Sequence, residues 1–238
     1  MFKKILDWFK SADELKNKKK SVINSKLSKT DSPKKRKIES SRIGELGEYK
    51  INIQLDQLPK GTKYISDIMI NNQKSRTGYS QIDHVVISPQ GIFVIETKNY
   101  NGEIKGGRSD KYWRVNNRFN MYNPLMQNYG HIKALEQVLN EYSDLLFISL
   151  ISFTMRCRFS IDPELRKIES NELIAYDTEL SEFINRKSNR IRATSDRALL
   201  TNDQIQKIYE IIQSSNITDN VIRAEHISKV KDKTNESS

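Results

Sequence analysis

The 238-residue sequence lacks the features that mark secreted or membrane-spanning chains. Its single cysteine, Cys157, cannot form a disulfide within the chain, which suits a protein kept in a reducing compartment. Because Cys157 lies in an apolar stretch, we expect a buried thiol rather than a nucleophile. No apolar run is long enough to span a membrane, and the N-terminal segment is too short and too interrupted for a signal peptide. These absences favour a cytoplasmic location.

Acidic residues are scarce in one segment of the chain. Residues 16–37 carry ten basic residues and one acid, Asp31, whereas the whole chain has 40 basic and 30 acidic residues. Subtracting this segment leaves 30 basic and 29 acidic residues, so the net charge falls from +10 to +1. Residues 16–42 are also poor in large apolar side chains and are predicted to be a disordered basic linker. Such a linker attracts nucleic acid or anionic lipid non-specifically, and the attraction weakens with salt. Its string PKKRK also resembles a nuclear import signal, but Lys-rich linkers produce such strings easily.

The first 15 residues form a separate short segment. Four apolar residues fall on one helical face, with lysines elsewhere: Phe2, Ile5, Leu6 and Phe9. One interpretation is an anchor for a membrane surface or a partner, which would make the protein peripheral at the membrane. The other is a frayed or docked chain end, because so short a helix seldom binds a membrane alone. The full division predicted is a segment at 1–15, a linker at 16–42, a folded domain at 43–222 and a polar tail at 223–238.

The folded region alternates helical and strand patterns. Helices are predicted over residues 43–58 and 123–142 and after residues 177 and 201. Strands are predicted over residues 63–70, 112–115, 145–153 and 173–176, and as a pair within residues 81–107. The paired strands are apolar on both faces, which is typical of a sheet covered on both sides. The sequence therefore predicts an α/β protein with a mixed central sheet flanked by helices.

Five polar residues of types common in catalytic sites lie along these predicted elements: Glu48, Asp83, Glu96, Lys98 and Gln127. The motifs that carry them are residues 44–48 (GELGE), 81–84 (QIDH), 91–98 (GIFVIETK), Trp113 and 123–127 (NPLMQ). This ordered set resembles the nuclease-related domain (NERD) family, a branch of the PD-(D/E)XK nuclease superfamily, over residues 42–155. The resemblance implies a restriction-endonuclease-like core and metal-dependent hydrolysis of phosphodiester bonds, in DNA rather than RNA.

Phosphodiester hydrolysis needs a hard cation that polarises the phosphate and lowers the pKa of a bound water. Asp83 and Glu96 can supply carboxylate ligands for Mg²⁺, with Mn²⁺ as a substitute, and the Thr97 backbone carbonyl is a reasonable third ligand. Lys98 follows Glu96 by two residues and points to the same face of the sheet. There it could position or deprotonate the attacking water, or stabilise charge on the phosphate.

Further residues are expected around this site. Glu48 could reach the site from the first helix, either as an additional metal ligand or as a residue that contacts the ligands. Gln127 lies in the first turns of its helix, where the positive end of the helix dipole favours phosphate. His131 follows one turn later and either flanks the same groove or lies on plain surface. With Gln127 and His131, Lys105 and Arg108 are the candidate nucleic-acid contacts.

The turn at Pro89 and Gln90 decides whether Asp83 and Glu96 can meet. A two-residue loop pairs Ser88 with Gly91 and places both carboxylates on one face. A three-residue loop, which Pro-Gln favours, shifts the pairing by one and separates them unless a bulge intervenes. Because the resemblance implies a shared site, we predict a bulge or a divergence of the strands.

Other functions stay open on the sequence alone. Asp83 and Lys98 could form a plain salt bridge at a sheet edge, with no role in chemistry. Alternatively, the domain could keep the fold as a module that binds nucleic acid without cleaving it. His84 alternates away from Asp83 and is interpreted as a packing or hydrogen-bonding residue. Trp113 could stack on bases or belong to the core.

Overall fold

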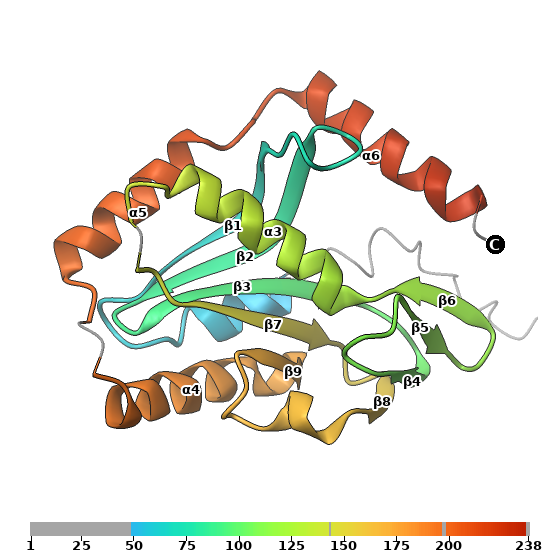
Figure 1. Cartoon of the computed structure of the whole chain (residues 1–238), viewed down its shortest axis with the longest axis horizontal. Helices are drawn as coiled ribbons and strands as arrows, with labels where there is room; N and C mark the ends of the chain where they lie inside the picture. The colour runs from blue at the N-terminus through green and yellow to red at the C-terminus, as the bar shows by residue number, and fades with distance from the viewer. Residues whose placement is uncertain (1–48, 143, 197–198, 237–238) are drawn as a thin grey trace, which may run out of the picture. The chain divides into compact units, whose positions relative to one another are not determined.

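The computed structural model describes residues 49–142, 144–196 and 199–236. The predictions for residues 1–15, the linker at 16–42 and Glu48 therefore lie outside the described residues. Residues 49–55 are helical, as expected for the end of the first helix. The other elements follow in chain order (Figure 1): β1 (Lys63–Asn71), β2 (Tyr79–Ser88), β3 (Gly91–Lys98), β4 (Gly102–Gly106), β5 (Tyr112–Val115), β6 (Phe119–Tyr122), α3 (Pro124–Val138), β7 (Phe147–Phe153), β8 (Cys157–Ile161), the 3₁₀ helix η1 (Pro163–Arg166), β9 (Glu172–Tyr176), the 3₁₀ helix η2 (Asp177–Glu179), α4 (Leu180–Thr194), α5 (Asn202–Ser214) and α6 (Asn220–Glu236).

The central sheet has five strands in the order β1-β2-β3-β7-β9. β1, β2 and β3 are antiparallel neighbours, whereas β7 runs parallel to both β3 and β9. Parallel neighbours need a crossover connection, and α3 lies on the connection between β3 and β7. The mixed sheet predicted from the sequence is thus confirmed.

Helices cover both faces of this sheet, which explains why β3 reads as a continuous apolar run (Figure 1). On the face of Val94, the core is completed by Leu135 of α3 and Ile208 of α5. On the face of Phe93, it is completed by Leu55 of the first helix and Ile184 of α4. Both faces of β3 are consequently buried up to Glu96.

A second, four-stranded sheet follows where the central one ends. Its order is β6-β5-β4-β8, with β4 and β8 parallel and the other pairs antiparallel. Strands β3 and β7 end at the paired residues Lys98 and Phe153, and the two segments pair again from Gly102 and Cys157. Of these strands, the sequence predicted β5 but not β6 or β8. Trp113 of β5 is fully buried beneath the sheet, so it is a core residue and not a base-stacking one.

The polar tail predicted from residue 223 is instead helical as far as Glu236. α6 is held to the end of the β1–β2 pair by polar contacts. Arg223 bonds with Asp67, and Nδ1 of His226 lies 3.0 Å from the Thr77 hydroxyl oxygen. These contacts join residues about 150 positions apart and have no signal in the local sequence pattern. Within the described residues, no helix combines the length and apolar character needed to cross a membrane.

Candidate active site

The β2–β3 turn brings the first predicted ligand to the site. Ser88 pairs with Gly91, so the loop has two residues, and pairing continues in register to His84 opposite Ile95. Gly91 has φ +148°, and a Cβ atom there would lie 2.6 Å from the Leu146 carbonyl oxygen. The turn therefore requires glycine at this position.

The three-residue loop that Pro-Gln favours is therefore wrong, and no bulge interrupts the paired residues. Strands β2 and β3 diverge only beyond that last pair. At the divergence Asp83 turns across to β3, where its Oδ2 accepts a hydrogen bond from the Thr97 backbone N–H at 2.7 Å. The Thr97 N–H therefore bonds to the Asp83 side chain and not to a backbone carbonyl of β2. This hydrogen bond holds the Asp83 carboxylate beside Glu96 and Lys98.

Three side chains from β3 and α3 converge next to Asp83. Lys98 Nζ lies 2.6 Å from Glu96 Oε1 and donates to Gln127 Oε1 at 2.9 Å. Gln127 Nε2 donates to Glu96 Oε1 at 2.7 Å, closing a triangle of contacts. Glu96 and Lys98 are two residues apart in a strand and share one face, as predicted.

His131 adds an imidazole one helical turn after Gln127. Its side chain is 10% exposed, and Nε2 lies 3.3 Å from Glu96 Oε2. The angles are not those of a hydrogen bond, so within the described part of the chain Glu96 Oε2 and both ring nitrogens of His131 are buried without a hydrogen-bond partner. His131 therefore belongs to the buried cluster and not to plain surface.

Burial and mutual charge oppose each other at this site. Burial raises the pKa of Glu96, but Lys98 and His131 outweigh it and bring the pKa to about 2. Burial lowers the pKa of Lys98, yet the carboxylates of Glu96 and Asp83 leave it above its ordinary value. The arrangement therefore holds Glu96 as a carboxylate and Lys98 as an ammonium group.

Two asparagines fix α3 over the sheet. Asn123 caps the helix by accepting from Leu125 N–H at 2.9 Å, and its Nδ2 donates to the Asp110 carbonyl at 2.7 Å. The fully buried Asn128 donates to the Val94 carbonyl and to Ser149 Oγ, both at 2.8 Å. The cap was expected from Asn-Pro, whereas the role of Asn128 was not. In the sequence, the only indication of this role is that Asn128 is a polar residue on the helix face that otherwise packs against the core.

Lys105 and Arg108, the other two predicted nucleic-acid contacts, each pair with a glutamate. Lys105 Nζ is 3.5 Å from Glu103 Oε2, and Arg108 Nε is 2.8 Å from Glu172 Oε2. Neither residue is part of the Glu96 cluster, and their role as nucleic-acid contacts stays a prediction. His84 points to the opposite face, with Nε2 3.0 Å from Asn52 Oδ1, in agreement with a hydrogen-bonding role. Burial raises the pKa of the Cys157 thiol to about 11, as expected for a structural cysteine.

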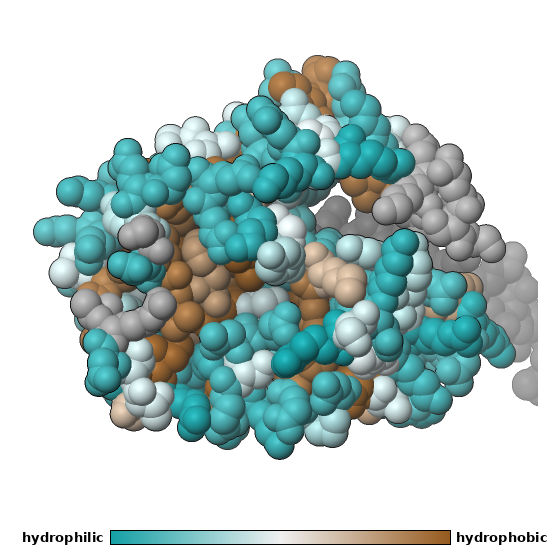
Figure 2. Space-filling model, in the orientation of Figure 1, coloured by the Kyte–Doolittle hydropathy of each residue, from teal (hydrophilic) through white to brown (hydrophobic). Residues whose placement is uncertain are grey.

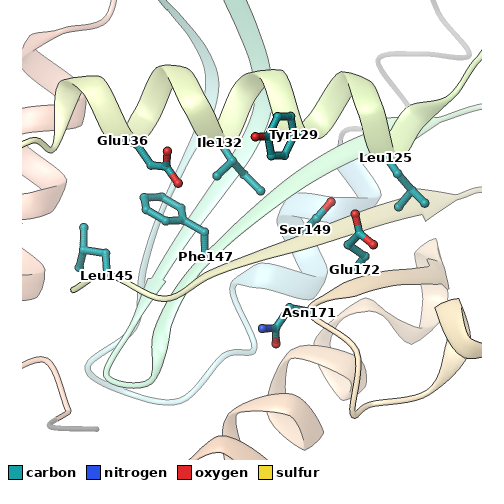
Figure 3. Close-up of a pocket in the computed structure, with 9 residues that line it drawn as sticks. All are labelled: Leu125, Tyr129, Ile132, Glu136, Leu145, Phe147, Ser149, Asn171 and Glu172. Atoms are coloured by element: carbon teal, nitrogen blue, oxygen red, sulfur yellow. The ribbon is translucent and has the colours of Figure 1, made fainter. Parts of the chain in front are cut away.

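A pocket of about 260 Å³ lies on the other side of α3, against β7 and the start of β9 (Figure 3). Leu125, Ile132 and Phe147 make much of its wall, and the surface in this hollow beneath α3 is apolar (Figure 2). None of the predicted catalytic side chains lines it. The predicted catalytic side chains thus lie outside this pocket, in the polar cluster.

The oxygen atoms of the cluster are of the type that binds a hard metal ion. Among the residues described, no group of three or more His, Cys, Asp or Glu side chains is arranged to hold a metal. The cluster does offer two carboxylates, Asp83 and Glu96, and Glu96 Oε2 is buried without a hydrogen-bond partner there. Mg²⁺ is commonly bound by one or two carboxylates, with waters and substrate oxygens completing its shell. The donor set fits such an ion.

Comparison with known proteins agrees with this geometry. A family model described as "nuclease-related domain", NERD, matches residues 43–154, which contain every described member of the cluster. An uncharacterized protein of Bacillus anthracis, pXO1-01, is 30% identical over 194 residues, covering 80% of this chain and 84% of the relative. The chain belongs to the NERD family. The family match ends before β8, so β8, β9 and helices α4 to α6 lie beyond it.

Similarity to solved structures adds nothing further to the assignment of this NERD protein. The crystal structure of AF1548, a protein of unknown function, covers 75% of this chain and 99% of its own chain. The two are 10% identical and superpose with a TM-score of 0.33, which is too low to support a conclusion.

Proposed function

We propose that this NERD protein is a metal-dependent nuclease that hydrolyses phosphodiester bonds in DNA. The observation that carries the proposal is the position of Lys98 Nζ, within hydrogen-bonding distance of both Glu96 and Gln127, one residue after Thr97, whose backbone N–H bonds to Asp83. Burying a lysine and two carboxylates from separate strands costs free energy. Proteins mostly bury such groups together at functional sites.

Asp83, Glu96 and the Thr97 backbone carbonyl would hold Mg²⁺, or Mn²⁺ in its place. When bound, such an ion polarises a phosphate oxygen and lowers the pKa of a coordinated water. The net reaction adds water across one P–O bond and leaves a phosphate on one strand end and a hydroxyl on the other.

The chain's own side chains do the remaining work. Lys98, held as an ammonium group, stabilises the negative charge that develops on the phosphate. Gln127 fixes the direction of Lys98 through its amide oxygen, so little reorganisation is needed when substrate arrives. The N-terminal end of α3 adds the positive end of its helix dipole next to the same phosphate. Basic residues 16–42, outside the described part of the chain, would add non-specific contacts with DNA.

Cleavage of plasmid and linear DNA by the purified protein tests the proposal. We expect activity with Mg²⁺ or Mn²⁺, none with EDTA, and a fall of at least about a hundredfold in Asp83→Ala and Lys98→Ala. Lys133→Ala is the matched control. Lys133 is a lysine of α3, but its side chain pairs with Glu136 at the surface. Cleavage that persists in both site variants would show that a contaminant is responsible.

The direct 2.6 Å contact between Lys98 and Glu96 favours a second candidate function. A closed ion pair of this kind can be purely structural, in a module that binds nucleic acid without cutting it. Salt-sensitive DNA binding with no metal-dependent cleavage would identify that module.

A further inference from the structure

The second sheet has one apolar face and one polar face. Ile104, Trp113 and Met121 point inward and are buried against the end of the central sheet. The alternate residues on the same strands point the other way, because successive side chains in a strand face opposite sides. We call the following six residues the outward face: Lys105, Tyr112, Arg114, Asn120, Tyr122 and Arg158.

The pairing register places these residues in rows across the strands. Tyr112 of β5 is opposite Tyr122 of β6, and Arg114 is opposite Asn120 on one side and Lys105 on the other. Directly opposite side chains lie about 5 Å apart, so each row is continuous. The outward face therefore alternates an aromatic row with a row of hydrogen-bond donors.

The two tyrosines are exposed rather than packed. Tyr112 and Tyr122 are each 43% exposed, and their rings meet edge to face with centroids 6.2 Å apart. Lys111 Nζ lies 5.4 Å from the centroid of the Tyr112 ring. Exposed aromatic rings beside cationic groups are the arrangement on which unpaired bases stack.

The charge of this surface is suited to a phosphate backbone. Lys105, Lys111, Arg114 and Arg158 are basic, whereas Glu103 and Asp110 are acidic, so positive charge is in excess on this surface. This excess is local, because outside residues 16–37 the chain as a whole is close to neutral. The exposed arginine of the central row, Arg114, has Asn120 and Lys105 as its cross-strand neighbours and no acid.

The outward face is also connected to the candidate active site at both ends. Four peptide steps join Lys98 to Gly102 at the start of β4, an extended reach of at most roughly 14 Å. At the other end, β6 leads through Asn123 directly into α3, which carries Gln127. A strand lying on this sheet would thus have a short path to the cluster.

We propose that the outward face is a binding platform for single-stranded DNA that feeds the candidate active site. The proposal rests on the proposed function for the identity of the substrate. Single strands are favoured over duplex because duplex DNA hides the faces of its bases, whereas the two tyrosines offer rings for stacking. Arg114 and Lys105 would contact phosphates, and Asn120 would reach base edges or sugars. Arg158 lies opposite the acid Glu103 in the pairing register and is not needed for these contacts.

Fluorescence anisotropy of the full-length protein in EDTA, where no cleavage is expected, tests the platform by itself. The probe is a labelled oligothymidylate of about 30 nucleotides, compared with a duplex of equal length. We expect Tyr112→Ala/Tyr122→Ala to weaken single-strand binding about tenfold or more and to leave duplex binding within about twofold. Tyr112→Phe/Tyr122→Phe keeps both rings and should bind like the unchanged protein.

Tyr129→Ala is the matched control. Tyr129 is 58% exposed and has Lys133 5.3 Å from its ring centroid, but it lines the pocket on the other side of α3. A loss of single-strand binding as large as that of the double alanine variant would show a general effect of removing tyrosines. Replacing both Arg114 and Lys105 by alanine should reduce the slope of log affinity against log salt by about 1.4.

Three results would overturn the platform: unchanged single-strand binding in the double alanine variant, equal losses for single strand and duplex, or tighter binding of an RNA oligonucleotide of the same length. These outcomes are separate from the failure of the nuclease proposal. Ring-dependent binding in a protein that never cleaves would leave the platform standing. Normal cleavage with ring-independent binding would remove the platform and leave the nuclease.

Discussion

Gln127 holds Lys98 in place from a different element of the fold, because its Oε1 accepts a hydrogen bond from Lys98 Nζ at 2.9 Å. The same amide donates through Nε2 to Glu96, the ionic partner of Lys98. One side chain on α3 therefore fixes both the carboxylate and the ammonium group that β3 carries. This contact makes α3 part of the site and more than a cover for the sheet.

Replacing Gln127 by leucine should slow DNA cleavage by about ten- to a hundredfold, because Lys98 would lose the group that orients it. The loss should appear in kcat, with KM little changed, since Lys98 keeps its charge and its contact with Glu96. Gln206→Leu is the matched control, because Gln206 is half-buried on α5 and bonds only with Glu210 among the described contacts. Full activity in Gln127→Leu would contradict a positioning role.

Asn128 gives a prediction about stability rather than chemistry. Asn128→Ala would leave the Val94 carbonyl and the Ser149 hydroxyl without their partner in the core. Leaving buried polar groups unpaired costs about 1–3 kcal/mol, so urea unfolding should show a loss of that size. Asn120→Ala, at an exposed position, should change the free energy of unfolding by less than about 0.5 kcal/mol. Equal effects of the two substitutions would refute the anchoring role of Asn128.

His84 predicts how stability depends on pH. Burial lowers its pKa from 6.5 to about 4, although the charge of Asp67 acts in the opposite direction. The unfolded chain therefore takes up the proton at a higher pH than the folded chain does. Stability should fall as the pH drops from 6.5 towards 4, by up to about 3 kcal/mol from this residue. Urea midpoints at pH 7.5 and 4.5 measure the effect, and His84→Gln should show a smaller drop. Parallel curves for the two proteins would mean that His84 does not titrate in this range.

The central sheet was predictable because its signals are local. Residues 92–95 are apolar on both faces, and Asn123 followed by Pro124 marks the start of α3. The same motifs led to the family and to Asp83, Glu96, Lys98 and Gln127. The register of the β2–β3 turn was not decided by local preference. Gly91 permits the two-residue loop because its missing Cβ lets the Leu146 carbonyl approach, a contact made with a distant segment.

The second sheet and the anchoring of α6 were harder to predict. β6 and β8 are four and five residues long, and half of their side chains are exposed, so their periodicity is weak. β8 is a strand because it pairs with β4, more than 50 residues away in the sequence. α6 depends on Asp67 and Thr77 on the β1–β2 pair. Contacts over such separations are set by the tertiary fold and leave no pattern in a single window of sequence.

Metal binding tests most directly whether Asp83 and Glu96 form one site with Lys98. Calorimetric titration of the full-length protein with Mn²⁺ should show one divalent site. The site should be lost in Asp83→Asn and Glu96→Gln, which remove carboxylate charge with little change in shape. It should be retained or tightened in Lys98→Ala, which removes a competing positive charge from Glu96. Mn²⁺ binding that is unaffected by both carboxylate substitutions, or absent from the unchanged protein, would contradict the account.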